Sequence, residues 1–165
     1  MKKNVFIFLF ISIGFFSCIS DETTTYYLIR HAEKERTDAT NKDPKLNQQG
    51  QERAEQWANY FKNTPLDAIY TTNYKRTLQT ATPAAKAKNI ALQSYSPNKL
   101  YDSIFQQNTK GKTVLVVGHS NTTPAFVNRI LGEEKYPNME DNDNATLFIV
   151  TIRGNKKTST TQKVH

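Results

Sequence analysis

The sequence predicts an α/β fold: a three-layer α/β/α sandwich around a mostly parallel sheet. Short apolar segments rich in aromatic and β-branched residues, such as Tyr26–Ile29 and Val114–Val117, are typical of strands buried on both faces. Such segments alternate along the chain with longer segments of helical periodicity, which favours helices packed on parallel strands. A length of 165 residues fits one domain with a sizeable core, preceded by an N-terminal extension.

The first predicted strand ends at His31, and a polar loop continues from there to Lys45. Asn47 is a suitable N-cap for a helix over about residues 48–62. The apolar residues of this helix fall on one face, as expected of a helix that packs against a sheet. They are Ala54, Trp57, Ala58 and Phe61.

A second strand is expected over residues 67–71, and the polar residues 71–73 are expected to cap a helix over about 74–88. Pro83 should kink, interrupt or divide this helix, because proline lacks an N–H and its ring clashes with the preceding turn. A third strand is expected around residues 90–95.

The C-terminal half continues the alternation of helices and strands. The expected elements are a helix that begins at Ser96-Pro97 and runs to about residue 107, a strand that ends at His119, a helix over residues 122–131 that Gly132 ends, an acidic loop over 133–144, a strand over 145–152, and a polar edge strand after Gly154-Asn155.

The N-terminus is typical of a signal peptide over residues 1–17. Lys2 and Lys3 precede an apolar stretch that is too short to span a membrane comfortably. Cys18, the single cysteine, follows Phe15-Phe16-Ser17, and this segment resembles the lipobox of bacterial lipoproteins. We therefore expect lipidation at Cys18, a tether over 18–24 and a domain over 25–165. The alternative is an ordinary leader followed by a cysteine without a role.

This N-terminus predicts an exported lipoprotein, periplasmic or on the cell surface, that contacts the membrane only through its N-terminal lipid. The formal net charge of +7 indicates a modest positive excess that can attract anions, including phosphate esters. No basic stripe interleaved with aromatic residues is present, so nucleic acid is not an expected partner.

Two of the three histidines follow the apolar segments directly, and His165 is the last residue. In open parallel sheets ligands bind beyond the carboxyl ends of the strands, so His31 and His119 are expected to form a site there. His165 is expected to be inert.

Four motifs in the same order resemble the histidine phosphatase superfamily, the phosphoglycerate mutase-like proteins of branch 1. Their order and spacing cover nearly all of the expected mature chain, from about residue 25 to 131. The motifs are Arg30-His31-Ala32-Glu33, Leu46-Asn47-Gln48-Gln49-Gly50 with Arg53-Ala54, Tyr70-Thr71-Thr72 with Arg76 and Thr80-Ala81, and Val117-Gly118-His119-Ser120-Asn121-Thr122.

The resemblance implies a phosphohydrolase that acts on small-molecule phosphomonoesters, without a cofactor, through a phosphohistidine on His31. It implies that Arg30, Arg76 and His119 hold the phosphoryl group. Thr37 falls where a phosphate-contacting asparagine is common, and its hydroxyl is expected to replace that donor. The alternatives are a phosphoglycerate mutase-like phosphotransferase and a non-catalytic lipoprotein that binds a phosphorylated ligand.

The chemistry of these side chains agrees with that reading. Arginine forks suit the oxygens of a phosphoryl group, and His119 and the start of the following helix can add donors. The imidazole of His31 is a nucleophile near neutral pH, and flanking arginines favour its neutral form. Arg30 and Arg76 as structural ion-pair partners are the alternative. A metal site of His31, Glu33 and His119 is not expected, because the arginines would repel a cation.

The general acid is the open position. Asp102 is the only carboxylate between Arg76 and His119, and the resemblance places a catalytic acid in this interval, so Asp102 is the first candidate. Glu33 is a second candidate, although at this motif position it more often orients backbone or arginine, and the position can also be vacant. Ala32 replaces the usual glycine, which matters only if the backbone there needs a positive φ.

Overall fold

The computed structural model describes residues 22–165. The expected signal peptide, Cys18 and the first part of the expected tether lie outside these residues. The strands are β1 (Thr23–Arg30), β2 (Ala68–Thr71), β3 (Leu92–Ser94), β4 (Thr113–Gly118), β5 (Thr146–Arg153) and β6 (Lys156–Lys163). The helices are α1 (Gln48–Tyr60), α2 (Lys75–Lys88), α3 (Ser103–Thr109) and α4 (Thr122–Leu131), and a 3₁₀ turn over Phe61–Asn63 extends α1.

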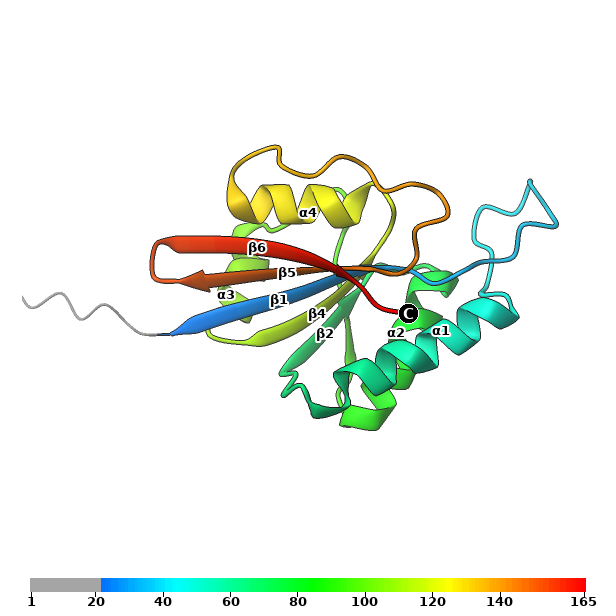
Figure 1. Ribbon diagram of the computed structural model, residues 1–165, viewed down its shortest axis with the longest axis horizontal. Coiled ribbons are helices and arrows are strands. Elements are labelled where there is room, and N and C mark those ends of the chain that lie inside the picture. Colours follow the sequence, from blue (N-terminus) through cyan, green and yellow to red (C-terminus); the bar gives the residue numbers. More distant parts are fainter. Residues whose placement is uncertain (1–21) are drawn as a thin grey trace, which may run out of the picture.

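The strands form a six-stranded sheet in the order β3-β2-β4-β1-β5-β6 (Figure 1). The β1–β4, β2–β4 and β2–β3 pairs are parallel, whereas β5 runs antiparallel to β1 and to β6. The expected mostly parallel sheet is confirmed. Its antiparallel part is the C-terminal hairpin, which adds to the edge of the sheet beside β1.

The two faces of the sheet carry separate hydrophobic clusters. Side chains on one face of the strands pack with Phe105 of α3 and with Phe126 and Ile130 of α4. Alternate strand residues on the other face pack with Trp57 of α1 and with Ala81 and Ala84 of α2 among others. Figure 1 shows α4 on one side of the sheet and α1 with α2 on the other. Because neighbouring strand residues point to opposite faces, this division gives the predicted three-layer sandwich.

Helix α1 forms as predicted. The Asn47 side chain accepts a hydrogen bond from the Gly50 N–H at 2.8 Å, which satisfies one of the donors that a helix start leaves free. The Trp57 side chain is 1% exposed and lies under the sheet, beside Ala54 and Ala58 on the same helical face.

Helix α2 differs from the expectation in two respects. It continues through Pro83 without a break, because Ala81, Ala84 and Ala85 on both sides of the proline are buried in the core and hold the helix on the sheet. It is also not capped by residues 71–73: Asp43, in the preceding loop, accepts a hydrogen bond from the Lys75 N–H at 2.9 Å. In α2, packing of the buried alanines thus overrides the helix-breaking effect of Pro83, and a carboxylate from another loop takes the place of the expected local cap.

The helix expected to begin at Ser96-Pro97 begins later, at Ser103. Tyr101 has a φ of 53° and cannot continue a right-handed helix, so residues 97–101 form turns. The Asp102 carboxylate is the N-cap of α3 and accepts a hydrogen bond from the Phe105 N–H at 2.8 Å. At the other end of the domain, β1 begins at Thr23, so the sheet starts earlier than the expected tether boundary at residue 24.

Within residues 22–165, no helix has the length and apolar character needed to cross a lipid bilayer.

Candidate active site

The candidate site lies where the central parallel strands end. Arg30 at the end of β1 is in register with Gly118 at the end of β4, and the His31 N–H donates to the Gly118 carbonyl at 2.9 Å. Strand β2 ends beside β4, and the chain from Thr72 to Arg76 follows it. His31, His119 and both arginine segments therefore emerge at one edge of the sheet, as the strand-end argument predicted.

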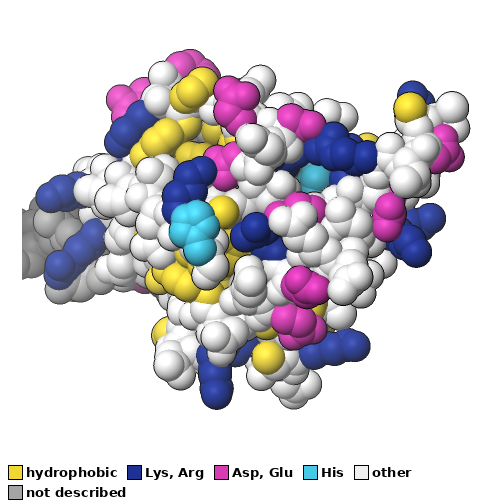
Figure 2. All heavy atoms as spheres, turned by 45° about the vertical axis from the view of Figure 1, so that its right-hand side comes forward, with side chains coloured by type: hydrophobic (Ala, Val, Ile, Leu, Met, Phe, Trp, Pro, Cys, Tyr) yellow, Lys and Arg dark blue, Asp and Glu magenta, His cyan; other side chains and the backbone are white. Residues whose placement is uncertain are grey.

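A hollow of about 450 Å³ at this edge, called the inner hollow here, collects the polar side chains. The structure brings Arg30, His31, Arg76 and His119 together around it, along with Lys34 and Asp141. Figure 2 shows Lys and Arg side chains gathered beside a recessed histidine on this side of the molecule.

The His31 imidazole is buried and has a defined tautomer. The residue is 3% exposed, and its Nδ1 lies 2.7 Å from the Ala32 carbonyl oxygen. A carbonyl can only accept, so Nδ1 carries the proton and, in the neutral ring, Nε2 keeps a free lone pair. Burial, together with the positive charge of Arg30, lowers the pKa of His31 to about 3, and the ring is neutral near pH 7. The arrangement makes Nε2 available as a nucleophile.

The His119 ring lies edge-on to His31, with 5.5 Å between the ring centroids, and its Nε2 is 2.9 Å from Thr72 Oγ1. Thr77 Oγ1 is 3.0 Å from Thr72 Oγ1 and donates its own proton to the Thr72 and Tyr74 carbonyl oxygens. The Thr72 hydroxyl must therefore donate to Thr77, which leaves Thr72 Oγ1 to accept from the Nε2–H of His119.

This chain of hydroxyls fixes the tautomer of His119. Burial, followed by the charges of Arg76 and Arg30, lowers the pKa of His119 to about 4. The free site therefore holds two neutral imidazoles next to two guanidinium groups. An anion that binds between them would counteract the positive charges and raise the pKa of both rings.

The Arg76 guanidinium faces the same hollow from the start of α2. Its Cζ lies 4.5 Å from the centroid of the Tyr74 ring, which in turn packs edge-on against the ring of His119. Its Nη1 is 3.6 Å from a carboxylate oxygen of Asp43, yet its buried Nε and Nη1 have no hydrogen-bond partner. Buried donors without partners are costly, so this side chain is arranged for an acceptor such as a phosphate oxygen.

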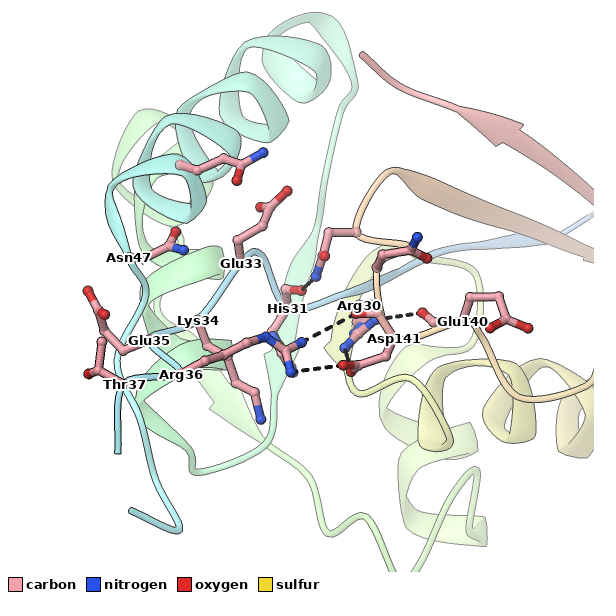
Figure 3. Close-up of a pocket in the computed structure, with 13 residues that line it drawn as sticks. Arg30, His31, Glu33, Lys34, Glu35, Arg36, Thr37, Asn47, Glu140 and Asp141 are labelled. Carbon is pink, nitrogen blue, oxygen red and sulfur yellow. Dashed lines mark hydrogen bonds and ion pairs between the residues drawn. The ribbon is translucent and has the colours of Figure 1, made fainter. Parts of the chain in front are cut away.

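Arg30 is 2% exposed and is held by the loop that precedes β5. Its Nη1 donates to the carbonyl oxygens of Glu140, at 2.8 Å, and Asp143, at 3.3 Å, and its Nη2 lies 3.0 Å from Asp141 Oδ1. The second carboxylate oxygen of Asp141 pairs with Arg36 at 2.8 Å. Figure 3 shows these side chains pointing toward one another. The buried Nε of Arg30 has no hydrogen-bond partner, like that of Arg76.

The second motif, Leu46–Gly50 with Arg53 and Ala54, packs against the segment that carries His31 and holds its backbone in place. A Cβ at Gly50 would lie 2.0 Å from the Glu33 carbonyl oxygen, so only glycine allows α1 to approach the backbone of this segment. Arg53 Nε donates to both carboxylate oxygens of Glu33, at 2.7 and 2.9 Å. Ala32 packs with Leu46 and Ala54 and does not have a positive φ. Alanine in place of the usual glycine is therefore compatible with this backbone.

Position 118 requires glycine because a side chain would not fit there, and not because of its backbone conformation. A Cβ there would lie 2.8 Å from both the Thr123 Oγ1 and the Tyr95 Oη atoms. The same crowding brings Thr122 Oγ1 within 3.1 Å of the His119 N–H, from which it accepts a hydrogen bond. These contacts fix the backbone from which the His119 side chain projects.

Two of the predicted residues do not reach the inner hollow. Asp102 caps α3 and lines neither of the hollows described here. Thr37 is exposed and lines a larger neighbouring hollow of about 960 Å³, called the outer hollow, and its side chain points away from Arg30 (Figure 3). Glu33, the second candidate acid, is instead held by Arg53, in agreement with the expectation that it orients an arginine.

The sequence reasoning missed three side chains that take part in the site. Lys34 and Asp141 line both the inner and the outer hollow, and the Asn144 amide donates to the His31 carbonyl oxygen at 2.8 Å. Lys34 had one signal in the sequence, its position directly after the Arg30–Glu33 motif. In the structure this segment is extended, because Lys34 pairs with Leu46 and the Glu35 N–H donates to the Lys45 carbonyl oxygen. In an extended segment alternate side chains share a side, so Lys34 and Arg36 project together.

The donor set of the site suits an anion. Among residues 22–165, no cluster of three or more His, Cys, Asp or Glu side chains is arranged to hold a metal ion. Around the inner hollow the charged groups are mainly cationic, from Arg30, Lys34 and Arg76, and Asp141 contributes the carboxylate.

Comparison with known proteins agrees with this geometry. Residues 26–96 match the model of the histidine phosphatase superfamily (branch 1), a stretch that includes Arg30, His31 and Arg76. His119 lies beyond the matched stretch, and the structure places its ring beside His31. No curated protein sequence matches the chain significantly.

The fold is similar to solved structures of this kind at low sequence identity. The protein histidine phosphatase SixA in complex with tungstate is 16% identical, with a TM-score of 0.65 over 84% of this chain and 96% of that chain. Phosphoglycerate mutase from Bacillus anthracis is 14% identical, with a TM-score of 0.65 over 86% and 93%. A mycobacterial glucosyl-3-phosphoglycerate phosphatase is 11% identical, with a TM-score of 0.60 over 78% and 90%. The chain thus has a phosphoglycerate mutase-like fold, and residues 26–96 match the histidine phosphatase superfamily (branch 1).

Proposed function

We propose that this protein is a phosphohydrolase that cleaves small-molecule phosphomonoesters through a phosphohistidine on Nε2 of His31. One observation carries the proposal: a buried imidazole with a free Nε2 lone pair shares a hollow with two guanidinium groups, each of which has a buried Nε without a hydrogen-bond partner. This combination supplies a nucleophile and an anion site at the same place.

In the first step the Nε2 lone pair of His31 attacks phosphorus, and the bond from phosphorus to the leaving oxygen breaks. Arg30 and Arg76 hold the equatorial oxygens, where negative charge is spread during transfer, and His119 donates to them once the bound anion has raised its pKa and protonated the ring. Each well-placed donor of this type contributes roughly 3–4 kcal/mol to the transition state. In the second step water attacks the phosphohistidine, inorganic phosphate leaves, and the His31 lone pair is restored.

The Nδ1–H of His31 remains hydrogen-bonded to the Ala32 carbonyl throughout, so the ring keeps its orientation while charge develops on it. The Asn144 amide fixes the His31 backbone from the other side. The nucleophile is therefore held in place before the substrate arrives.

The proposal is tested with the purified chain and 4-nitrophenyl phosphate, with and without EDTA. We expect turnover that EDTA does not reduce, that His31→Gln abolishes and that His165→Gln leaves unchanged, because His165 is exposed and lines neither hollow. Equal rates for the wild type and His31→Gln would reject the mechanism.

Product analysis separates hydrolysis from the alternative activities. A hydrolase releases one inorganic phosphate per substrate, whereas a mutase-like phosphotransferase returns the phosphoryl group to a second hydroxyl. A non-catalytic binding protein would bind inorganic phosphate without turnover. A screen of phosphorylated metabolites would then identify the physiological substrate.

We also propose that the protein is exported and anchored to a membrane by a lipid on Cys18. Support comes from the sequence alone, namely the positive and apolar residues 1–17 and the lipobox-like segment before the cysteine. Cys18→Ala should move the protein from the membrane fraction to the soluble fraction. A wild-type protein that is already soluble would contradict this proposal.

A further inference from the structure

The proposed reaction needs a proton for the leaving oxygen, and the carboxylates near the site are poorly suited to give one. Asp102 caps α3, and both oxygens of Glu33 accept hydrogen bonds from Arg53. Asp141 reaches the inner hollow, but the hydrogen bonds and charges of Arg36 and Arg30 lower the pKa of its carboxyl. An ionised carboxylate has no proton to donate near pH 7.

The position of the leaving oxygen follows from the two adjoining hollows. His31, Arg76 and His119 surround the inner hollow, which suits the phosphoryl group, and the outer hollow has room for the remainder of a small substrate. The leaving oxygen joins these two parts of the substrate, so it lies where the hollows meet. The residues that line both hollows are Arg30, His31, Lys34 and Asp141.

Of these residues, Lys34 has a proton to give. His31 is the nucleophile, and an arginine does not lose its proton in a protein. The Lys34 side chain extends from the 34–37 segment on the same side as Arg36 (Figure 3), and it lines both hollows. Partial burial and the positive charges of Arg76 and Arg36 lower the pKa of its ammonium, which makes it a better acid than a solvated lysine.

We propose that Lys34 is a catalytic residue, the general acid that protonates the leaving oxygen. This inference rests on the proposed phosphohydrolase function. As the His31 Nε2–phosphorus bond forms and the phosphorus–oxygen bond breaks, the electron pair of the broken bond stays on the leaving oxygen, which takes a proton from the Lys34 ammonium. An alcohol leaves, and Lys34 becomes a neutral amine.

The second step restores the starting state. Water attacks phosphorus, its proton moves to the Lys34 amine, and the electron pair of the nitrogen–phosphorus bond returns to His31. The site then holds inorganic phosphate, a neutral imidazole and an ammonium group, so protons and charges balance over the cycle.

The test compares Lys34→Arg with Lys34→Met on two substrates. Arginine keeps the positive charge but does not release a proton, so it separates acid catalysis from electrostatic binding. With ethyl phosphate, whose alkoxide is a poor leaving group, we expect both variants to lower kcat by about 10²–10⁴-fold. With 4-nitrophenyl phosphate, whose leaving group needs no proton, the loss in kcat for Lys34→Arg should stay below about tenfold, since its charge is kept.

Lys42→Arg is the matched control, because Lys42 is exposed in the same loop and lines neither hollow. It should leave both rates unchanged. Circular dichroism of each variant checks the fold. A second readout is the pH profile for ethyl phosphate: the alkaline decline in kcat that reports loss of the Lys34 proton should disappear in Lys34→Arg.

Wild-type rates for ethyl phosphate in Lys34→Arg, or equal losses on both substrates, would overturn the role of Lys34 as an acid. These outcomes differ from failure of the proposed function itself, in which the wild type does not hydrolyse 4-nitrophenyl phosphate or does so without His31. That second failure would overturn both proposals.

Discussion

The low pKa values of His31 and His119 predict a specific dependence of stability on pH. Both rings are neutral in the folded protein, with pKa values lowered to about 3 and about 4, whereas an unfolded histidine has the model value of 6.5. Below pH 6.5 the unfolded chain therefore binds protons that the folded protein does not bind. The free energy of unfolding is highest above this pH and falls as the pH drops toward 4.

The size of the effect follows from these values. At pH 5 each histidine should lower the free energy of unfolding by about 2 kcal/mol relative to neutral pH. Two such losses are a large part of the roughly 5–15 kcal/mol that is typical of a domain. The carboxyl groups of Asp141 and Asp143, with pKa values below 3.8, lose their contribution only at lower pH and do not disturb this window.

Urea unfolding of the wild type, His31→Gln and His165→Gln at pH 5 and pH 7.5 measures the effect. Glutamine does not titrate, so His31→Gln should lose about half as much stability between the two pH values as the wild type does. His165→Gln should behave like the wild type. Only the change with pH is compared, so a constant loss of stability in a variant cancels. Equal pH dependence in the wild type and His31→Gln would refute the buried neutral imidazole.

Three further predictions concern the surroundings of the site. Asp141→Asn should lower the Kd for inorganic phosphate about twofold to fivefold in titration calorimetry at low salt, because it removes a carboxylate that competes with phosphate for Arg30. Asp38→Asn, a change at an exposed residue, should have no effect. An unchanged Kd in Asp141→Asn would count against this competition. Thr77→Val should lower kcat about tenfold with little change in KM, because it breaks the chain of hydroxyl groups that orients His119. Thr77→Ser keeps the hydroxyl and should keep the rate. An equal loss of kcat in both variants would indicate that Thr77 acts through packing instead. Asn47→Ala should lower the free energy of unfolding by about 1 kcal/mol in urea unfolding, whereas Gln51→Ala on the exposed face of α1 should change it little; equal effects would contradict the capping role of Asn47.

The sequence was sufficient for the sheet and for the centre of the site. Tyr26–Ile29 and Val114–Val117 have the composition of buried strands, and residues at the carboxyl ends of neighbouring parallel strands must lie close together. His31 and His119 could therefore be paired before the structure was known. The strand ends alone do not predict the position of Arg76, because it depends on where α2 begins. The resemblance of the segment around Arg76 to the family motif predicted that position.

The acid was harder to predict because local signals competed. Ser96-Pro97 and Asp102 are both good starts for a helix, and the serine–proline pair predicts the earlier start. The structure shows that Tyr101 adopts a left-handed conformation and that Asp102 caps α3, which is a structural role for the carboxylate. A capping role and a catalytic role use the same residue type, so composition alone does not distinguish them.

The contacts of the loops were not predictable from sequence spacing. Asp141 and Arg30 are more than a hundred positions apart, and their contact depends on how the loop before β5 returns across the end of β1. Likewise, Pro83 stays inside α2 because the flanking alanines are buried, a tertiary effect with no local signature. Such interactions appear only once the layers are assembled.

The most direct test of the central claim is to trap the phosphorylated protein. The wild type and His31→Gln are mixed briefly with a ³²P-labelled phosphomonoester that the wild type hydrolyses, quenched in alkali, and digested for peptide mapping. The account predicts a label that is stable in alkali and lost in acid, located on Nε2 of His31 and absent from the variant. A label on another residue, or turnover by the wild type without a trapped phosphohistidine in a rapid-quench time course, would contradict it.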